Sequence, residues 1–245
     1  MALISSKKQY KKLITFGCSY TAGFNLGEKA AWGYHLSQLL GCEHFNMGGC
    51  QTNYNIFVDL LDYCEKNDMT DCCVGIQFTD VSRREYWDME QKKYHSFGLG
   101  ELKSFGGNVD TYYNGVIDKN LEFFDKIWYQ RDENLLRTIH SILICKNYLE
   151  NHNIDFIMFE GIHSIMEVWF EKKEGLLFRN QMGLTSMEYR QSLLNDVTFF
   201  TELGDLHKTQ QSHPDYNTDE NITHPSVGVV KWWTQAMYDY IVKNS

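Results

Sequence analysis

A serine lies at the centre of a small-residue turn near the start of the chain, in the segment 17–23 (GCSYTAG). A β-prone run at residues 13–16 precedes this segment and a helical pattern follows it, so Ser19 stands where a strand turns towards a helix. Such a turn can present a hydroxyl while neighbouring backbone N–H groups point towards an anion. The segment is therefore a candidate nucleophile site, and an ordinary helix-capping serine is the alternative interpretation.

Alternating strand and helix patterns must position that serine. Residues 72–78 (CCVGIQF) form a nearly continuous apolar run, as expected for a strand covered on both faces of a parallel sheet. The pattern predicts a three-layer, doubly wound (flavodoxin-like) α/β fold, in which ligands bind beyond the carboxyl ends of the strands. Parallel strands are predicted at 13–16, 44–47, 72–78 and 154–159, and helices at 32–40, after a cap at Asn53, at 135–149 and at 226–243.

Two long stretches do not follow this alternation. Residues 88–130 and 163–218 are polar-aromatic and weakly periodic, and they are too long for simple connections. We interpret them as insertions or lids beside the site. The length of 245 residues suits one α/β domain, so we predict a single domain over 1–245.

Composition excludes several classes of protein. A net charge of −9 argues against a nucleic-acid partner, which needs a basic face. No stretch approaches the roughly 20 apolar residues of a membrane helix, so no membrane partner is expected. The seven cysteines lack CxxC spacing, which favours reduced thiols in a cytoplasm over a disulfide framework or a zinc site.

The serine turn resembles the first block of the SGNH (GDSL-like) hydrolase superfamily, Gly-Asp-Ser-x-Thr-x-Gly. Members encoded by phages often carry Gly-Cys-Ser-Phe/Tyr-Thr at this place, as this chain does. The resemblance implies that Ser19 is the nucleophile and that its backbone N–H is one oxyanion donor. Cys18 replaces the family aspartate at a position that is structural in the family, so no member of the triad is lost.

Two further segments resemble the second and third blocks of the family. Residues 46–53 (NMGGCQTN) make Gly49 the best match for a backbone oxyanion donor, and Cys50, standing where a further glycine is usual, leaves the register open by one residue. Residues 77–87 (QFTDVSRREYW) place Thr79 where most members offer an asparagine donor. A hydroxyl can donate, but it reaches less far than an amide.

The segment 219–226 (DENITHPS) resembles the last block, Asp-x-x-His-Pro-Ser/Asn, and implies that His224 is the base. The family's acid position is occupied by Asn221, and the nearest carboxylates are Asp219 and Glu220. An acid partner fixes the imidazole tautomer and stabilises the imidazolium. We expect Asp219 or a backbone carbonyl to orient His224, with Glu220 as a further alternative, and we expect Ser19 and His224 within about 3–4 Å of each other.

The resemblance spans residues 17 to 226 and implies a serine esterase or acylhydrolase that uses no metal or organic cofactor. It implies a small-molecule or carbohydrate ester as substrate, acetyl esters among them, and a place in the host cytoplasm or the virion if a phage encodes the chain. The oligomeric state stays open.

Two other functions remain open. An eroded binding or virion-associated structural module is favoured by Thr79, Cys50 and Asn221, which depart from the family pattern. A thiol enzyme would use Cys18 or Cys50, and it would need a thiolate of low pKa beside His224.

Overall fold

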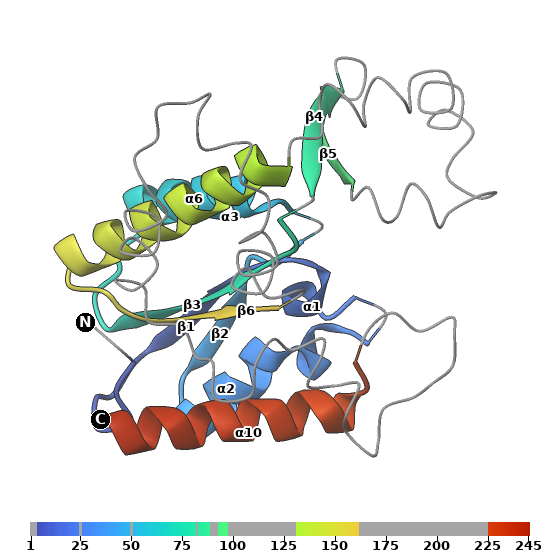
Figure 1. Cartoon of the computed structure of the whole chain (residues 1–245). Coiled ribbons are helices and arrows are strands. Elements are labelled where there is room, and N and C mark those ends of the chain that lie inside the picture. Colours follow the sequence, from blue (N-terminus) through green and yellow to red (C-terminus); the bar gives the residue numbers. More distant parts are fainter. Residues whose placement is uncertain are drawn as a thin grey trace, which may run out of the picture.

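The computed structural model describes residues 4–24, 26–49, 51–81, 83–88, 93–97, 131–161 and 225–245, with the backbone alone at 84–88, 93–97 and 131–136. Its centre is a four-stranded parallel sheet with the order β2-β1-β3-β6 (Figure 1). Numbered among themselves, these strands have the order 2-1-3-4, which is the flavodoxin-like arrangement predicted from the sequence. The strands are β1 (Lys12–Phe16), β2 (Glu43–Asn46), β3 (Cys72–Phe78) and β6 (Asp155–Glu160).

The two central strands, β1 and β3, are apolar because helices cover both of their faces. All seven residues of β3 are buried, and so are the last four of β1. The register pairs Phe16 with Ile76 and Phe78 with Glu160, so the carboxyl ends of β1, β3 and β6 lie along one edge. The four predicted strands are confirmed, each to within one residue at its ends.

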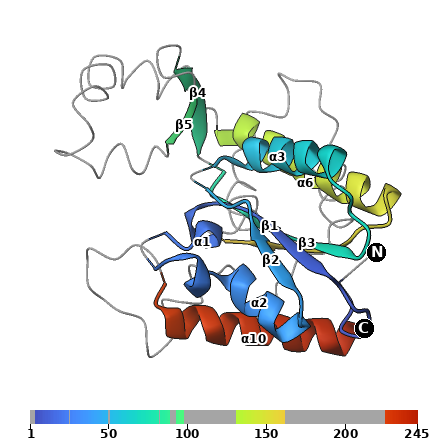
Figure 2. The same ribbon diagram turned by 180° about the vertical axis from the view of Figure 1, so that it is seen from behind.

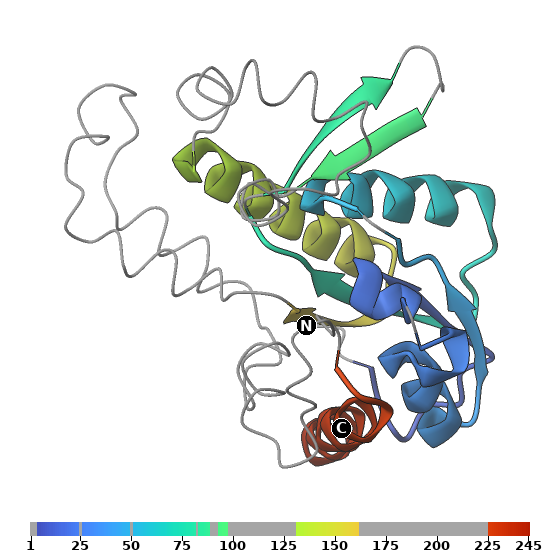
Figure 3. The same ribbon diagram turned by 90° about the vertical axis from the view of Figure 1, so that its right-hand side faces the viewer.

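Two pairs of helices sandwich the sheet. Helices α3 (Asn53–Lys66) and α6 (Arg131–Asn151) cover one face, and α2 (Trp32–Leu40) and α10 (Val227–Asn244) cover the other (Figures 1 and 2). In Figure 3, α10 is seen end-on beneath the sheet, with α3 and α6 on the opposite side. Successive strand residues alternate between the two cores: Ile14 packs with Ile56 and Ile142, whereas Leu13 packs with Leu36 and Trp233.

The structure corrects one boundary and adds one element. Helix α3 is capped by Thr52, whose hydroxyl accepts from the Asn55 N–H at 3.2 Å, so the predicted cap at Asn53 is wrong by one residue. An antiparallel hairpin of β4 (Arg84–Asp88) and β5 (Lys93–Phe97) overlaps the start of the predicted insertion 88–130 and forms its own two-stranded sheet. The rest of that insertion and all of 163–218 lie outside the described residues.

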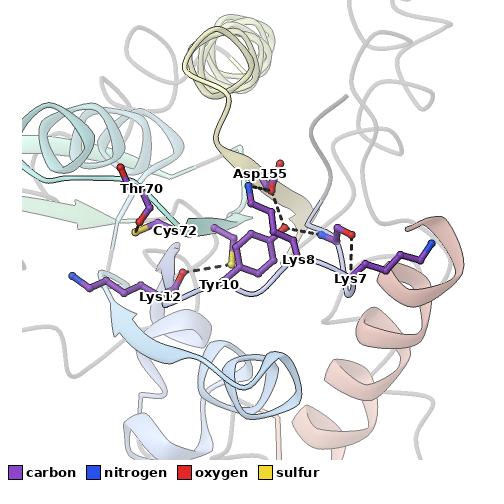
Figure 4. Close-up of polar contacts among 9 residues, drawn as sticks. Lys7, Lys8, Tyr10, Lys12, Thr70, Cys72 and Asp155 are labelled. Atoms are coloured by element: carbon purple, nitrogen blue, oxygen red, sulfur yellow. Dashed lines mark hydrogen bonds and ion pairs between the residues drawn. The ribbon is translucent and has the colours of Figure 1, made fainter.

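The segment before β1 binds to the sheet at the amino ends of its strands, opposite the edge where Ser19 lies (Figure 4). Tyr10 donates its hydroxyl to Asp155 Oδ2 at 2.8 Å, and Lys8 Nζ forms an ion pair with the same oxygen at 2.7 Å. Burial raises the pKa of Tyr10 well above its usual range. A cavity of about 340 Å³ lies at this edge, lined by residues that precede β3 and β6, such as Asp71 and Asn153. Among the described residues, no helix is long and apolar enough to cross a membrane.

Candidate active site

Ser19 lies where the chain leaves β1. Helix α1 (Ser19–Ala22) is a single turn that begins at this serine and ends at Gly23, which has a left-handed backbone (φ 70°). Cys18, not Ser19, holds the cap position, so the interpretation of Ser19 as an ordinary helix cap is wrong. The serine is 6% exposed and belongs to the carboxyl edge of the sheet.

The serine turn packs too tightly for side chains at two glycines. A Cβ on Gly17 would lie 2.1 Å from Thr21 Oγ1, and a Cβ on Gly48 would lie 2.5 Å from the backbone nitrogen of Ala22. Asn46 reinforces this approach, because its Nδ2 donates to the Thr21 carbonyl at 2.8 Å and its Oδ1 accepts from the Gly48 N–H at 2.9 Å. The loop after β2 is thereby held against the serine turn, as the order of the sequence blocks predicts.

Gly49 lies in that loop, but its N–H is already engaged. It donates to the Gly17 carbonyl at 3.0 Å, so Gly49 has no backbone hydrogen left for an oxyanion in this arrangement. This corrects the predicted role of Gly49. The next backbone donor along the chain belongs to Cys50, which lies outside the described residues and is the other register that the sequence left open.

Thr79 follows β3 directly and carries an unpaired hydroxyl. Its backbone is clamped by Asn53, which accepts from the Thr79 N–H at 2.7 Å and donates to the Thr79 carbonyl at 2.9 Å. The residue is 1% exposed, yet within the part of the chain that the structure describes Oγ1 has no hydrogen-bond partner. An orphaned buried hydroxyl costs about 1–3 kcal/mol and calls for an explanation, of which a role towards a ligand is one.

The sheet topology brings Ser19 and Thr79 to the same region. In the sheet, β2 lies on one side of β1 and β3 lies on its other side. The direction in which the strands are added therefore reverses between β1 and β3. Ligands of such sheets bind at this switch point, beyond the carboxyl ends of the strands. Ser19 and Thr79 follow the two strands that flank it, whereas the cavity near Asp71 lies at the opposite edge.

Sequence reasoning missed Gln77, a fully buried residue near the end of β3. Its side chain accepts hydrogen bonds from Thr21 and Trp32 and donates to Cys18 Sγ at 3.4 Å. The available signal was one amide within the otherwise apolar run CCVGIQF. Cys18 is 0% exposed, so its thiol is buried and a thiol enzyme that uses Cys18 is not supported.

The predicted base and its orienter lie outside the described residues. This applies to His224, Asp219 and Asn221, so their contacts and the expected approach of His224 to Ser19 stay predictions. Pro225, the first described residue after this segment, is buried. Helix α10 begins two residues later and is capped by the Ser226 hydroxyl, which accepts from the Val229 N–H at 3.4 Å. In Figure 1, α10 begins on the side of the molecule where α1 lies.

Comparisons with known proteins found structural likeness only. No family model matches the chain, and no curated protein matches it. A protein assigned to the lipolytic G-D-S-L family of Desulfitobacterium hafniense DCB-2 is similar over 95% of this chain and 99% of its own length, with 12% identity and a TM-score of 0.48. An acetyl xylan esterase from the rumen bacterium Butyrivibrio proteoclasticus is similar over 95% of this chain and 63% of its own, with 14% identity and a TM-score of 0.47.

A member of the lipolytic G-D-S-L family from Veillonella parvula DSM 2008 is similar over 68% of this chain and 84% of its own, with 15% identity and a TM-score of 0.29. The fold assignment itself rests on the strand order and the helix layers of this chain. Together, the sheet and the three loops beyond its strands form an α/β scaffold that holds a serine and an orphaned buried hydroxyl at its switch point.

Proposed function

We propose that this chain is a serine ester hydrolase of the SGNH type, with Ser19 as nucleophile and His224 as base. The observation that carries the proposal is that Ser19 follows one central strand and Thr79 the other, and that the buried Thr79 hydroxyl has no partner among the described residues. A buried donor with no partner is what an oxyanion site needs before its ligand arrives. The resemblance of the four sequence blocks supports the same assignment.

The proposed reaction proceeds in two halves. Ser19 Oγ attacks the acyl carbon while His224 takes its proton, and the resulting oxyanion accepts from the Ser19 N–H and the Thr79 hydroxyl. A third donor comes from the 49–50 turn, and Cys50 fits it better than Gly49, whose N–H is engaged with Gly17. His224 then protonates the departing alkoxide, and water cleaves the acyl enzyme by the reverse route.

The proposed substrates are small acyl esters, acetyl esters included, on carbohydrate or lipid carriers. The sequence resemblance is the source of this proposed substrate class. It is also the source of the proposed phage-type branch and of the proposed place in the host cytoplasm or virion. The function is tested with p-nitrophenyl esters of two, four and eight acyl carbons. We expect turnover of the acetyl ester that Ser19→Ala and His224→Ala each reduce by about ten-thousandfold or more; turnover that survives Ser19→Ala would overturn the proposal.

The orienter of His224 is tested by variants at Asp219 and Asn221. If Asp219 supplies the charge, Asp219→Ala lowers kcat steeply with little change in KM, because the imidazolium forms only as the serine proton moves, and Asn221→Ala is mild. A rise of orders of magnitude on Asn221→Asp would mean that the wild-type chain lacks its acid.

One observation favours the second candidate, an eroded binding or virion-associated module. The Gly49 N–H that would serve the oxyanion is spent on Gly17. In that case Ser19 would stay inert towards esters in the wild type and would not react with a fluorophosphonate probe, which labels only an activated serine.

A further inference from the structure

We propose that Gln77 is a positioning residue that locks the serine turn in its working geometry. The inference rests on the proposed function, because it assigns Gln77 to the site of Ser19. Its basis is a buried polar network beneath that turn, which the catalytic steps themselves do not use.

The side chain of Gln77 joins three partners. Its Oε1 accepts from Thr21 Oγ1, and from Trp32 Nε1 at 3.3 Å, while its Nε2 donates to Cys18 Sγ at 3.4 Å. Trp32 Nε1 also donates to Thr21 Oγ1 at 3.0 Å, which closes the network. Thr21 and Cys18 lie on either side of Ser19 in the sequence, so Gln77 holds the turn at two points.

An amide suits this place. One end must accept hydrogen bonds and the other must donate, and glutamine offers both without a charge. Gln77 is 0% exposed, so a carboxylate here would have to be desolvated, and an aliphatic chain would leave the Thr21 hydroxyl without its acceptor.

Two glycines make room for the amide. A Cβ on Gly161, just beyond β6, would lie 1.8 Å from Gln77 Nε2, and a Cβ on Gly17 would lie 2.9 Å from Gln77 Cβ. Gly161 is itself held by its N–H, which donates to the Phe78 carbonyl at 2.8 Å. The ends of β1 and β6 are therefore both shaped around the side chain that β3 contributes.

The consequence concerns the rate of the chemical step. Loss of the amide would free the turn, and with it the hydroxyl and the N–H of Ser19, which must both be aligned when the oxyanion forms. A displacement of about 1 Å can cost a hundredfold in rate. Because the amide lies beneath the turn, substrate binding should change little.

The test compares Gln77→Leu and Gly161→Ala with the control Thr234→Val. Thr234 is equally buried, and its hydroxyl bonds to the Val230 carbonyl within α10, away from the turn. We expect Gln77→Leu and Gly161→Ala to lower kcat for an acetyl ester about 10–100-fold with KM within about threefold, and Thr234→Val to leave both unchanged. Gly161→Ala is informative because it displaces the amide without touching the serine turn.

A double-mutant cycle tests whether Gln77 acts through Thr21. If it does, Thr21→Val and Gln77→Leu together cost no more than the larger single loss. Independent losses that multiply, or a Gln77→Leu enzyme with wild-type kcat, would overturn the proposal. If Gln77→Leu fails to fold, Gln77→Met keeps the chain length without the amide and takes its place.

Amide hydrogen exchange of the peptide around 17–24 separates this proposal from the proposed function. Faster exchange there in Gln77→Leu, but not in Thr234→Val, supports the locking role whether or not the wild type hydrolyses esters. Unchanged exchange refutes the lock even in an active enzyme, whereas an inactive wild type with lost protection in Gln77→Leu refutes the hydrolase alone.

Discussion

Replacing Thr79 by valine removes a buried hydroxyl while keeping the shape of the side chain. Thr79 is 1% exposed, and its hydroxyl has no hydrogen-bond partner among the described residues, so the folded protein carries the cost of desolvating that hydroxyl without a compensating bond. Thr79→Val should therefore raise the free energy of unfolding by about 1–3 kcal/mol. For a chain of this size, each kcal/mol corresponds to a Tm about 2–4 °C higher.

The same change should damage catalysis. If the hydroxyl donates to the oxyanion, its loss costs about a hundred- to a thousandfold in kcat, or about 2.7–4 kcal/mol. Stability and activity thus move in opposite directions. Thermal unfolding and p-nitrophenyl acetate turnover of the same preparation measure both.

Thr15→Val is the matched control on the neighbouring strand. Thr15 is also fully buried, but its Oγ1 bonds to His44 Nε2 at 2.8 Å. Its replacement should lower the Tm, because the imidazole nitrogen loses its partner, and should leave turnover intact. Unchanged turnover in Thr79→Val, or a Tm that falls as in Thr15→Val, would refute the assignment of Thr79 as an oxyanion donor.

Two further predictions follow from side chains whose pKa is displaced by their surroundings. Burial lowers the pKa of His44 to about 4 from 6.5, so the contribution of His44 to stability is complete above about pH 6.5 and is lost as the pH falls towards 4. His44→Gln should therefore flatten the Tm–pH curve between pH 4 and 6.5, and an unchanged slope would contradict this. A hydrogen bond with Cys73 lowers the pKa of the Cys42 thiol, whereas burial raises that of Cys64 to about 12. Iodoacetamide at pH 8 should modify Cys42 before Cys64, as followed by peptide mass spectrometry, and the reverse order would count against it.

The parallel sheet could be predicted because burial on both faces leaves a direct mark on sequence. The run at 72–78 is apolar throughout, and helical periodicity separates it from the other strands. The cap of α3 shows the limit of local reasoning. Thr52 and Asn53 can both cap a helix. The Asn53 side chain is hydrogen-bonded to the backbone of Thr79, which is distant in sequence, so Thr52 is the residue that caps α3.

The positions of Ser19 and Thr79 beyond their strands could be predicted because the signals are local. Ser19 is marked by the small residues around it, and Thr79 by its place after a strand. Gln77 could not be found in this way, because its role depends on Gly161 and Trp32, which only the folded chain brings to it. The hydrogen bond from the Gly49 N–H to the Gly17 carbonyl could not be predicted either, because it depends on how the loops after β1 and β2 pack against each other.

Labelling with a fluorophosphonate probe tests the central claim most directly, since the probe reacts with an activated serine and spares an ordinary hydroxyl. Peptide mass mapping should place one adduct on Ser19 in the wild type, and Ser19→Ala and His224→Ala should prevent labelling. The Thr15→Val protein should label like the wild type. An adduct on another residue, or an intact folded wild-type protein that stays unlabelled, would contradict the account of this chain as a serine hydrolase.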